Sequence, residues 1–158
     1  TPVRGSELVL GKLVPYFAIG MLDVTVAVVV GDLLFAVPLR GSVVLVFAMA
    51  AVFLVGTLAL GVWISVVAKN QMLANQLAMV LTFVPAFLLS GLVFAIANMP
   101  TALQVMTNLI PARHFVAFLR GVYLKGVGLE VLAAEAGILV AFAVALLALA
   151  NARFRKRL

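Results

Sequence analysis

Residues 43–68 are VVLVFAMAAVFLVGTLALGVWISVVA, an apolar run without a single charged side chain. At a helical rise of ~1.5 Å per residue, a run of this length can cross the ~30 Å hydrocarbon core of a bilayer. Backbone N–H and C=O groups in that core must bond to one another, and an α-helix achieves this within one segment. The run therefore predicts a transmembrane helix.

Similar apolar runs lie on both sides of this one, so we predict four spans, at 13–37, 43–68, 72–96 and 129–152. Hydrophobic residues make up 66% of the chain and charged residues 10%, whereas soluble domains carry roughly 25% charged residues. Too few charges remain to cover a water-facing surface, which excludes a soluble domain. The predicted fold is an all-α polytopic transmembrane helical bundle in the lipid bilayer.

Residues 98–126 break the pattern of spans, because prolines and glycines divide them into stretches too short to cross a bilayer. We expect an outer re-entrant helical hairpin there. Within the third span, Pro85 removes a backbone donor, and Ser90 and Gly91 follow it. A kink or an unwound turn is expected in that region.

The two ends of the chain are more polar. Residues 1–12 predict a cytoplasmic interfacial helix, and the basic residues of 153–158 predict a cytoplasmic tail. Lys and Arg are more numerous on the side that would hold both ends, which places the C-terminus in the cytoplasm. The first residue is Thr1, so we expect the chain to begin inside a longer protein.

Several function classes are excluded by what the sequence lacks. The net charge is +6, yet the basic residues are not gathered on a face with interleaved aromatics, so no nucleic-acid partner is expected. There is no cysteine and only one histidine, which predicts no metal site. No G-x-x-x-x-G-K-[ST], H-E-x-x-H or G-x-S-x-G motif occurs. The chain is therefore not expected to be an enzyme or to hold a cofactor.

Asp23 lies near the centre of the first span. A carboxylate at that depth costs ~2.5–3.5 kcal/mol on insertion scales, so it should face the bundle or a water-filled path. Two interpretations stay open: a transport-path or proton-linked group, and a hydrogen-bonded structural residue.

Two structural ion pairs are expected near the outer side. Asp32 lies close to the turn that contains Arg40, and Glu135 lies in the last span at the level of the basic residues of the hairpin, Arg120 among them. Further contacts between helices are expected from a polar cluster of Gln71, Asn75 and Gln76 and from a small-residue ladder of Ala133, Gly137, Ala141 and Ala145. Whether the partner of the ladder lies within this chain is open.

Four segments together resemble the membrane-spanning subunit of ABC-2 type transporters, the type V exporter permeases of bacteria. They are TPVRGSELVLGK at 1–12, VPLRGS at 37–42, LSGLVF at 89–94 followed by NMP at 98–100, and LIP, RHF and LRG within 109–121. The resemblance covers essentially the whole chain. One departure is Ala95, where the family often has proline, so the bend after Phe94 should be softer here.

The resemblance implies a bacterial inner-membrane subunit with six spans, of which this chain holds the last four. It implies pairing with a second permease subunit and with two separate ATPase subunits, and export of drugs or other hydrophobic compounds. Residues 1–12 would lie beside the region that touches the ATPase, with Glu7 and Lys12 transmitting the motion. The segment 98–126 would help to close the exit.

Near the substrate path we expect Asp23, Phe87, Ser90 and Gly91. Two alternatives remain at this point. One is an ion-coupled secondary transporter or channel that uses Asp23 as its coupling carboxylate. The other is a membrane scaffold that transports nothing.

Overall fold

The computed structural model describes residues 5–68 and 70–154, with side chains described at residues 11, 13–68 and 70–152. These residues form helices and connecting turns and contain no strand. The long helices are α1 (Gly5–Phe35), α2 (Val43–Val67) and α7 (Leu129–Phe154). Four helical stretches are long and apolar enough to span a membrane, at Leu13–Phe35, Val43–Val67, Gln71–Leu89 and Leu129–Ala152. The predicted all-α polytopic bundle is confirmed.

The remaining elements are short. The third span consists of α3 (Gln71–Ala78), the π-helix η1 (Met79–Phe83) and α4 (Val84–Leu89). After it come the 3₁₀-helix η2 (Ile96–Asn98) and α5 (Thr101–Thr107). Helix α6 (Pro111–Arg120) and the π-helix η3 (Gly121–Lys125) then lead to α7.

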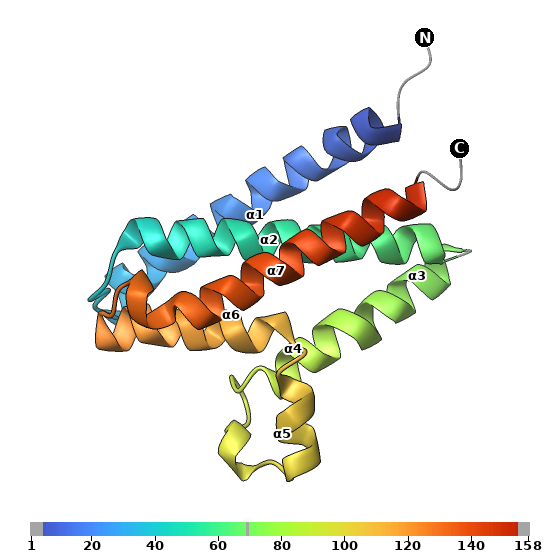
Figure 1. Ribbon diagram of the computed structural model, residues 1–158. Coiled ribbons are helices and arrows are strands. Elements are labelled where there is room, and N and C mark those ends of the chain that lie inside the picture. The colour runs from blue at the N-terminus through green and yellow to red at the C-terminus, as the bar shows by residue number, and fades with distance from the viewer. Residues whose placement is uncertain (1–4, 69, 155–158) are drawn as a thin grey trace.

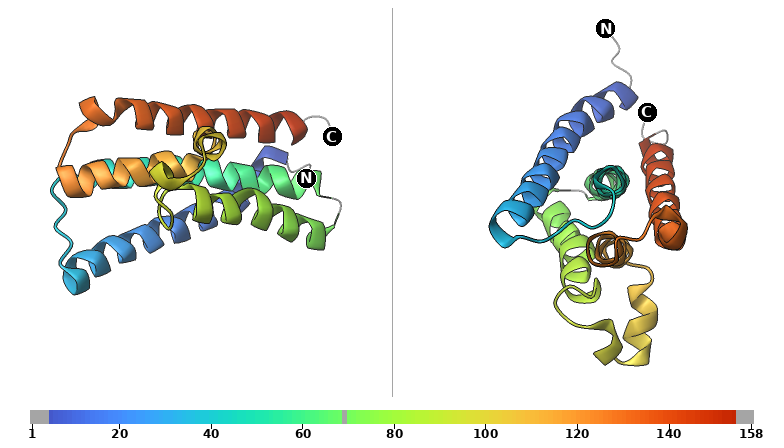
Figure 2. Two further views of the ribbon diagram at one scale, coloured as in Figure 1. Left: turned by 90° about the horizontal axis from the view of Figure 1, so that it is seen from below. Right: turned by 90° about the vertical axis from the view of Figure 1, so that its left-hand side faces the viewer.

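The long helices run roughly lengthwise through the bundle (Figure 1). One end, here the terminal end, holds the start of α1, the end of α7 and the link from α2 to α3. The other, the turn end, holds the α1–α2 turn and the link from η3 to α7. Helix α5 projects sideways from the bundle, and α6 returns from there to the turn end. Viewed along its length, the bundle has α2 at its centre (Figure 2).

Helix α7 packs on α2 along a regular stripe. Its buried side chains recur at alternating steps of four and three residues: Leu132, Ala136, Leu139, Ala143, Leu146 and Ala150. A β-carbon on Gly56 of α2 would lie 3.3 Å from the Cα of Ala143, so the two backbones approach closely. The predicted ladder of Ala133, Gly137, Ala141 and Ala145 lies instead on the exposed face of α7. It has no partner in the described part of this chain.

Helix α6 completes the buried core against α2 and α7. Phe118 and Val122 are fully buried and pack with Val46, Met49 and Leu139. At the edge of this cluster the rings of Phe53 and Phe115 stack with their centroids 4.5 Å apart. The core thus joins the α6–η3 segment to two of the candidate spans.

Helix α1 is continuous from Gly5 to Phe35. The interfacial helix expected at 1–12 and the span that follows it therefore share one helix, with no break at Lys12. Pro15 lies inside this helix, which continues on both sides of it, although proline removes one backbone donor there.

The third span ends at Leu89 instead of the expected residue 96. Gly91 adopts a left-handed backbone with φ of +79°, which stops the helix. The expected disturbance around Pro85 takes the form of η1, in which the Val84 N–H bonds to Met79 O, five residues back. A proline would clash with the carbonyl four residues before it in a regular α-helix, and the wider π-turn relieves that clash.

Candidate functional site

The chain bends sharply where the third span ends. Ser90 is buried, and its Oγ accepts a hydrogen bond of 3.3 Å from the Leu92 N–H. Gly91 supplies the left-handed conformation that the bend requires. A β-carbon at Gly91 would also lie 3.0 Å from Cδ1 of Ile96. A side chain at this position would be strained, so the bend requires glycine.

Three exposed apolar side chains follow the bend. Leu92, Val93 and Phe94 retain 64%, 46% and 55% of their accessible surface. We refer to residues 92–94 as the lip. The rest of the described chain therefore leaves about half of the surface of these apolar residues uncovered.

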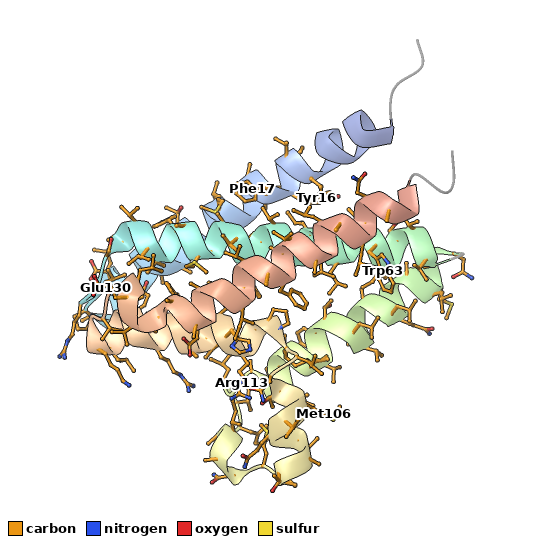
Figure 3. The ribbon with its side chains drawn as sticks, in the orientation of Figure 1. Tyr16, Phe17, Trp63, Met106, Arg113 and Glu130 are labelled. Carbon is orange, nitrogen blue, oxygen red and sulfur yellow. The ribbon has the colours of Figure 1, made fainter. Side chains whose placement is uncertain are left out.

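Basic side chains of α6 bind residues 104–108, here called the far arm; residues 90–94 are called the near arm. Nη1 of Arg113 donates to Gln104 O at 3.2 Å and also to Oγ1 of Thr107, which is fully buried. Nε2 of His114 lies 3.0 Å from Asn108 O and donates to it in the tautomer that protonates this nitrogen. Figure 3 shows Arg113 at the junction of α5 and α6. These donors satisfy carbonyls that the end of the short helix α5 leaves without intrahelical partners.

Arg120, the last residue of α6, binds the near arm. Its Nη2 donates a 2.7 Å hydrogen bond to Gly91 O, across 29 positions of sequence. Sequence reasoning expected Arg120 to pair with Glu135, which is half-buried on α7. The structure gives Arg120 a backbone partner, and the ion pair with Glu135 stays a prediction.

The α1–α2 turn is fastened to η3 by contacts that involve two glycines. A β-carbon at Gly41 would lie 2.8 Å from Val122 O, and one at Gly126 would lie 3.2 Å from Arg40 O. Gly126 also has a φ of +62°. Nη1 of Arg40 reaches Leu124 O at 3.5 Å. We call this arrangement the turn clasp.

Asp32, predicted to pair with Arg40, influences Tyr123 of η3. Burial and the negative charge of Asp32 together raise the pKa of Tyr123 above its ordinary value. Asp32 thus acts on η3 near the turn clasp, while Arg40 donates to a backbone carbonyl.

Comparison with known proteins now identifies the family, because residues 1–151 match the model of the ABC-2 family transporter protein. The chain belongs to the ABC-2 transporter family. It is 37% identical over its full length to the probable multidrug ABC transporter permease YbhS of Escherichia coli, and covers 42% of that protein. The probable multidrug permease YbhR of the same organism is 30% identical over 83% of this chain and 35% of the relative.

A eukaryotic protein also matches. The ABC transporter G family member 20 of Dictyostelium discoideum is 30% identical over 81% of this chain, which covers 17% of that relative. The ABC-2 chain thus spans less than half the length of these curated relatives. No solved structure matches it significantly.

Of the grooves that flank α2 in this ABC-2 chain, two include polar or charged side chains. The first, about 450 Å³, lies between α1, α2 and the α6–η3 segment and is lined mainly by apolar side chains, with Arg120 and Tyr123 among them. Ala27 lines it from α1, and Asp23 is exposed one helical turn before Ala27 on the same face. Asp23 therefore lies beside the groove and apart from the bend at Gly91.

The second groove, about 530 Å³, lies at the terminal end between α2 and α3. Gln71 and Asn75 of the predicted polar cluster line it, together with Gly61 and Ser65 of α2. Gln76, the third member of the cluster, is exposed. The sequence pattern located this polar region but could not show that α2 and α3 diverge around it.

Phe87 lies on α4, one turn before the bend. It is 47% exposed, and its ring stacks on Phe83 with the centroids 5.7 Å apart. The structure thus brings Phe87, Ser90 and Gly91 together and leaves Asp23 on another helix. The side chains of Glu7 and Lys12 lie outside the described residues. In the described part of this ABC-2 chain, no group of three or more His, Asp or Glu could hold a metal ion.

The carbonyl-binding roles of Arg113, His114 and Arg120 were missed by sequence reasoning, which treated the basic residues as partners for carboxylates. One signal was available: three basic residues follow a segment broken by proline and glycine. Broken helices expose carbonyls, and arginine has several donors that can reach them.

Proposed function

We propose that this chain is the transporting part of a permease subunit in an ATP-driven exporter of drugs or other hydrophobic compounds. The observation that carries the proposal is the family match over residues 1–151. The names of the bacterial relatives, multidrug ABC transporter permeases, support it. The relatives' names describe permeases, which supports placing ATP hydrolysis in partner ATPase subunits.

The terminal end of the bundle faces the cytoplasm in this proposal, and the turn end faces the outside. The distribution of Lys and Arg supports that orientation. The ATPase would act at the terminal end, where α1 begins, with Glu7 and Lys12 in the coupling region. The subunit would work as a dimer with a second permease, in a bacterial inner membrane.

The substrate path would run along the exposed side of the third span toward the bend. Phe87 presents an aromatic face there, and Ser90 and Gly91 form the bend itself. Asp23 would line the path from α1, where its carboxylate is exposed at the depth of an apolar span. The lip after the bend would close the outer side of the path, because its exposed apolar side chains can exclude water when they meet a partner surface.

Reconstitution of the full-length protein tests this proposal. Mild solubilisation and affinity capture should bring down an ATP-hydrolysing subunit. In proteoliposomes, the resulting complex should move a hydrophobic dye only with ATP, and a variant of the ATPase that cannot hydrolyse ATP serves as the control. Transport that ignores ATP depletion and follows a pH gradient would contradict the proposal and favour ion coupling through Asp23.

A further inference from the structure

The lip is held from one side by a residue that the proposed path does not use. The bend uses the left-handed conformation of Gly91, but a glycine backbone is conformationally free, so glycine alone does not hold the bend in one direction. The Gly91 carbonyl oxygen is bound by Nη2 of Arg120 at 2.7 Å. This bond connects the bend to α6, which is anchored in the core through the fully buried Phe118.

Arg120 is an unusual residue for this position. It lines the apolar groove between α1, α2 and α6, with mainly apolar neighbours. Arg120 is exposed on the described bundle, and on a surface that faces lipid a guanidinium group is costly unless its donors are used. Hydrogen bonds from a charged donor to a carbonyl are shorter and stronger than neutral ones. The bond to Gly91 O gives the charge a defined partner.

We propose that Arg120 is a positioning residue for the outer closure: its bond to Gly91 O holds the lip of Leu92, Val93 and Phe94 in the closed position. The inference rests on the proposed function, in which the lip closes the path. Arg120 does not touch substrate in this account. It acts through the bend, and the contacts of α6 with α2 and α7 make it a fixed point from which the bend is held.

The far arm is bound to α6 by other residues, so the proposed role of Arg120 is limited to the near arm. Arg113 and His114 fasten the carbonyls of Gln104 and Asn108, which lie on the far arm beyond the lip. The near arm, from Ser90 to the lip, is bound to α6 through Arg120. Loss of Arg120 should therefore free the lip while the far arm stays in place.

Arg120→Met tests this inference in the full-length transporter with its ATPase, in proteoliposomes. Methionine keeps much of the length of arginine and suits an apolar environment, but it cannot donate. We expect the ATP-independent leak of a hydrophobic dye to rise about tenfold, the contribution of one hydrogen bond to a charged group. Arg120→Lys, which can still donate, should recover most of the loss. Lys125→Met removes a nearby charge and should leave the leak unchanged.

A distance measurement separates positioning from general damage. The 158 residues contain no cysteine, so once any cysteine elsewhere in the complex is replaced, spin labels can be placed through Val93→Cys on the lip and Ala117→Cys on α6. The distance distribution between them should broaden in Arg120→Met and return toward that of the unmodified protein in Arg120→Lys. A pair of labels at Gln104 and Ala117 should not change, because Arg113 still holds that arm.

A variant in which alanine replaces all three lip side chains separates the role of Arg120 from the closure assigned to the lip. If that variant leaks and Arg120→Met neither leaks nor shifts the label distance, Arg120 does not position the lip, and the inference is overturned while the proposed closure stands. If the lip variant does not leak, the closure assigned to the lip under the proposed function is wrong. In that case the label distances alone decide whether Arg120 positions the bend.

Discussion

Helices α1 and α7 are both long apolar helices that lie against α2, yet they pack on it very differently. Their spans have similar mean hydropathy, 2.1 for Leu13–Phe35 and 2.4 for Leu129–Ala152. Of the α7 window 28% is buried inside the described bundle, and of the α1 window none. Hydropathy therefore does not decide how closely a span packs, since lipid is as good a solvent for leucine as a neighbouring helix.

The difference lies in the size of the side chains at the contact. Helix α7 presents alternating Leu and Ala to α2, and Ala143 admits the backbone of Gly56. Helix α1 presents larger residues such as Phe17 and Val24, which stay half-exposed. At Gly20 of α1, an added β-carbon would meet the flexible end of the Leu54 side chain of α2 at 2.8 Å. Small residues in register produce close packing, and isolated ones produce a shallow contact.

The largest expected effect comes from Gly56→Leu, which should disrupt the close packing of α7 on α2. The new side chain would have to enter the space of the Ala143 backbone, and overpacking of this kind costs about 3 kcal/mol at its upper range. Thermal unfolding of the full-length protein in detergent, followed by far-UV circular dichroism, should show a lower midpoint.

Gly61→Leu is the matched control, on the same helix. A β-carbon at Gly61 meets nothing within 4 Å, so the midpoint should hardly change. Equal losses in the two variants would contradict the assignment of α2–α7 as the close contact. A loss at Gly61 in the complete complex alone would instead show that another helix covers the groove between α2 and α3.

A smaller effect is expected from Gly126→Ala, which tests the turn clasp. The clasp connects the turn after the loosely packed α1 to η3. A left-handed alanine costs about 1–2 kcal/mol, and its β-carbon would press on Arg40 O at 3.2 Å. Cleavage by a protease at the turn end should become faster. Gly128→Ala, where nothing lies within 4 Å, should leave the rate unchanged, and a similar acceleration there would argue against the clasp.

The smallest effect concerns Tyr123 and Asp32, the electrostatic contact between α1 and η3. Burial and then the charge of Asp32 raise the pKa of Tyr123, so the folded state holds this proton more tightly than the unfolded state. The resulting stability is complete below the ordinary tyrosine pKa and is lost as pH rises through the folded value. Asp32→Asn should move the Tyr123 titration, measured as tyrosinate absorbance, to lower pH while burial keeps it above the ordinary value. An unmoved titration would show that α1 does not lie near Tyr123.

The sequence predicted the class of fold because hydrophobic length and helical rise are sufficient to identify a span. It also located the broken segment, since Pro and Gly mark breaks whatever surrounds them. It did not identify which face of α7 is buried. Two small-residue patterns coexist there, and only the three-dimensional path of α2 selects the one through Ala136 and Ala143 over the one through Gly137.

The candidate site was predicted in part for a related reason. Ser90 and Gly91 are recognisable locally, and both lie in the bend. The partner of Arg120 is 29 positions away in sequence, and a backbone carbonyl carries no residue-specific signal. A charge-based expectation therefore favoured Glu135, whereas the geometry of a broken helix provided a carbonyl.

The stripe on α7 also limits how this bundle can move. Leucine and alanine alternate with a repeat of seven residues, the heptad spacing of a left-handed supercoil. Sliding α7 by one turn would set leucine where alanine is needed, and the next matching register lies ~10 Å away along the axis. In the proposed transport cycle, helices α2 and α7 should thus move as one rigid unit, and α1 and the third span, which have no buried residues in their apolar windows, should be the helices that shift.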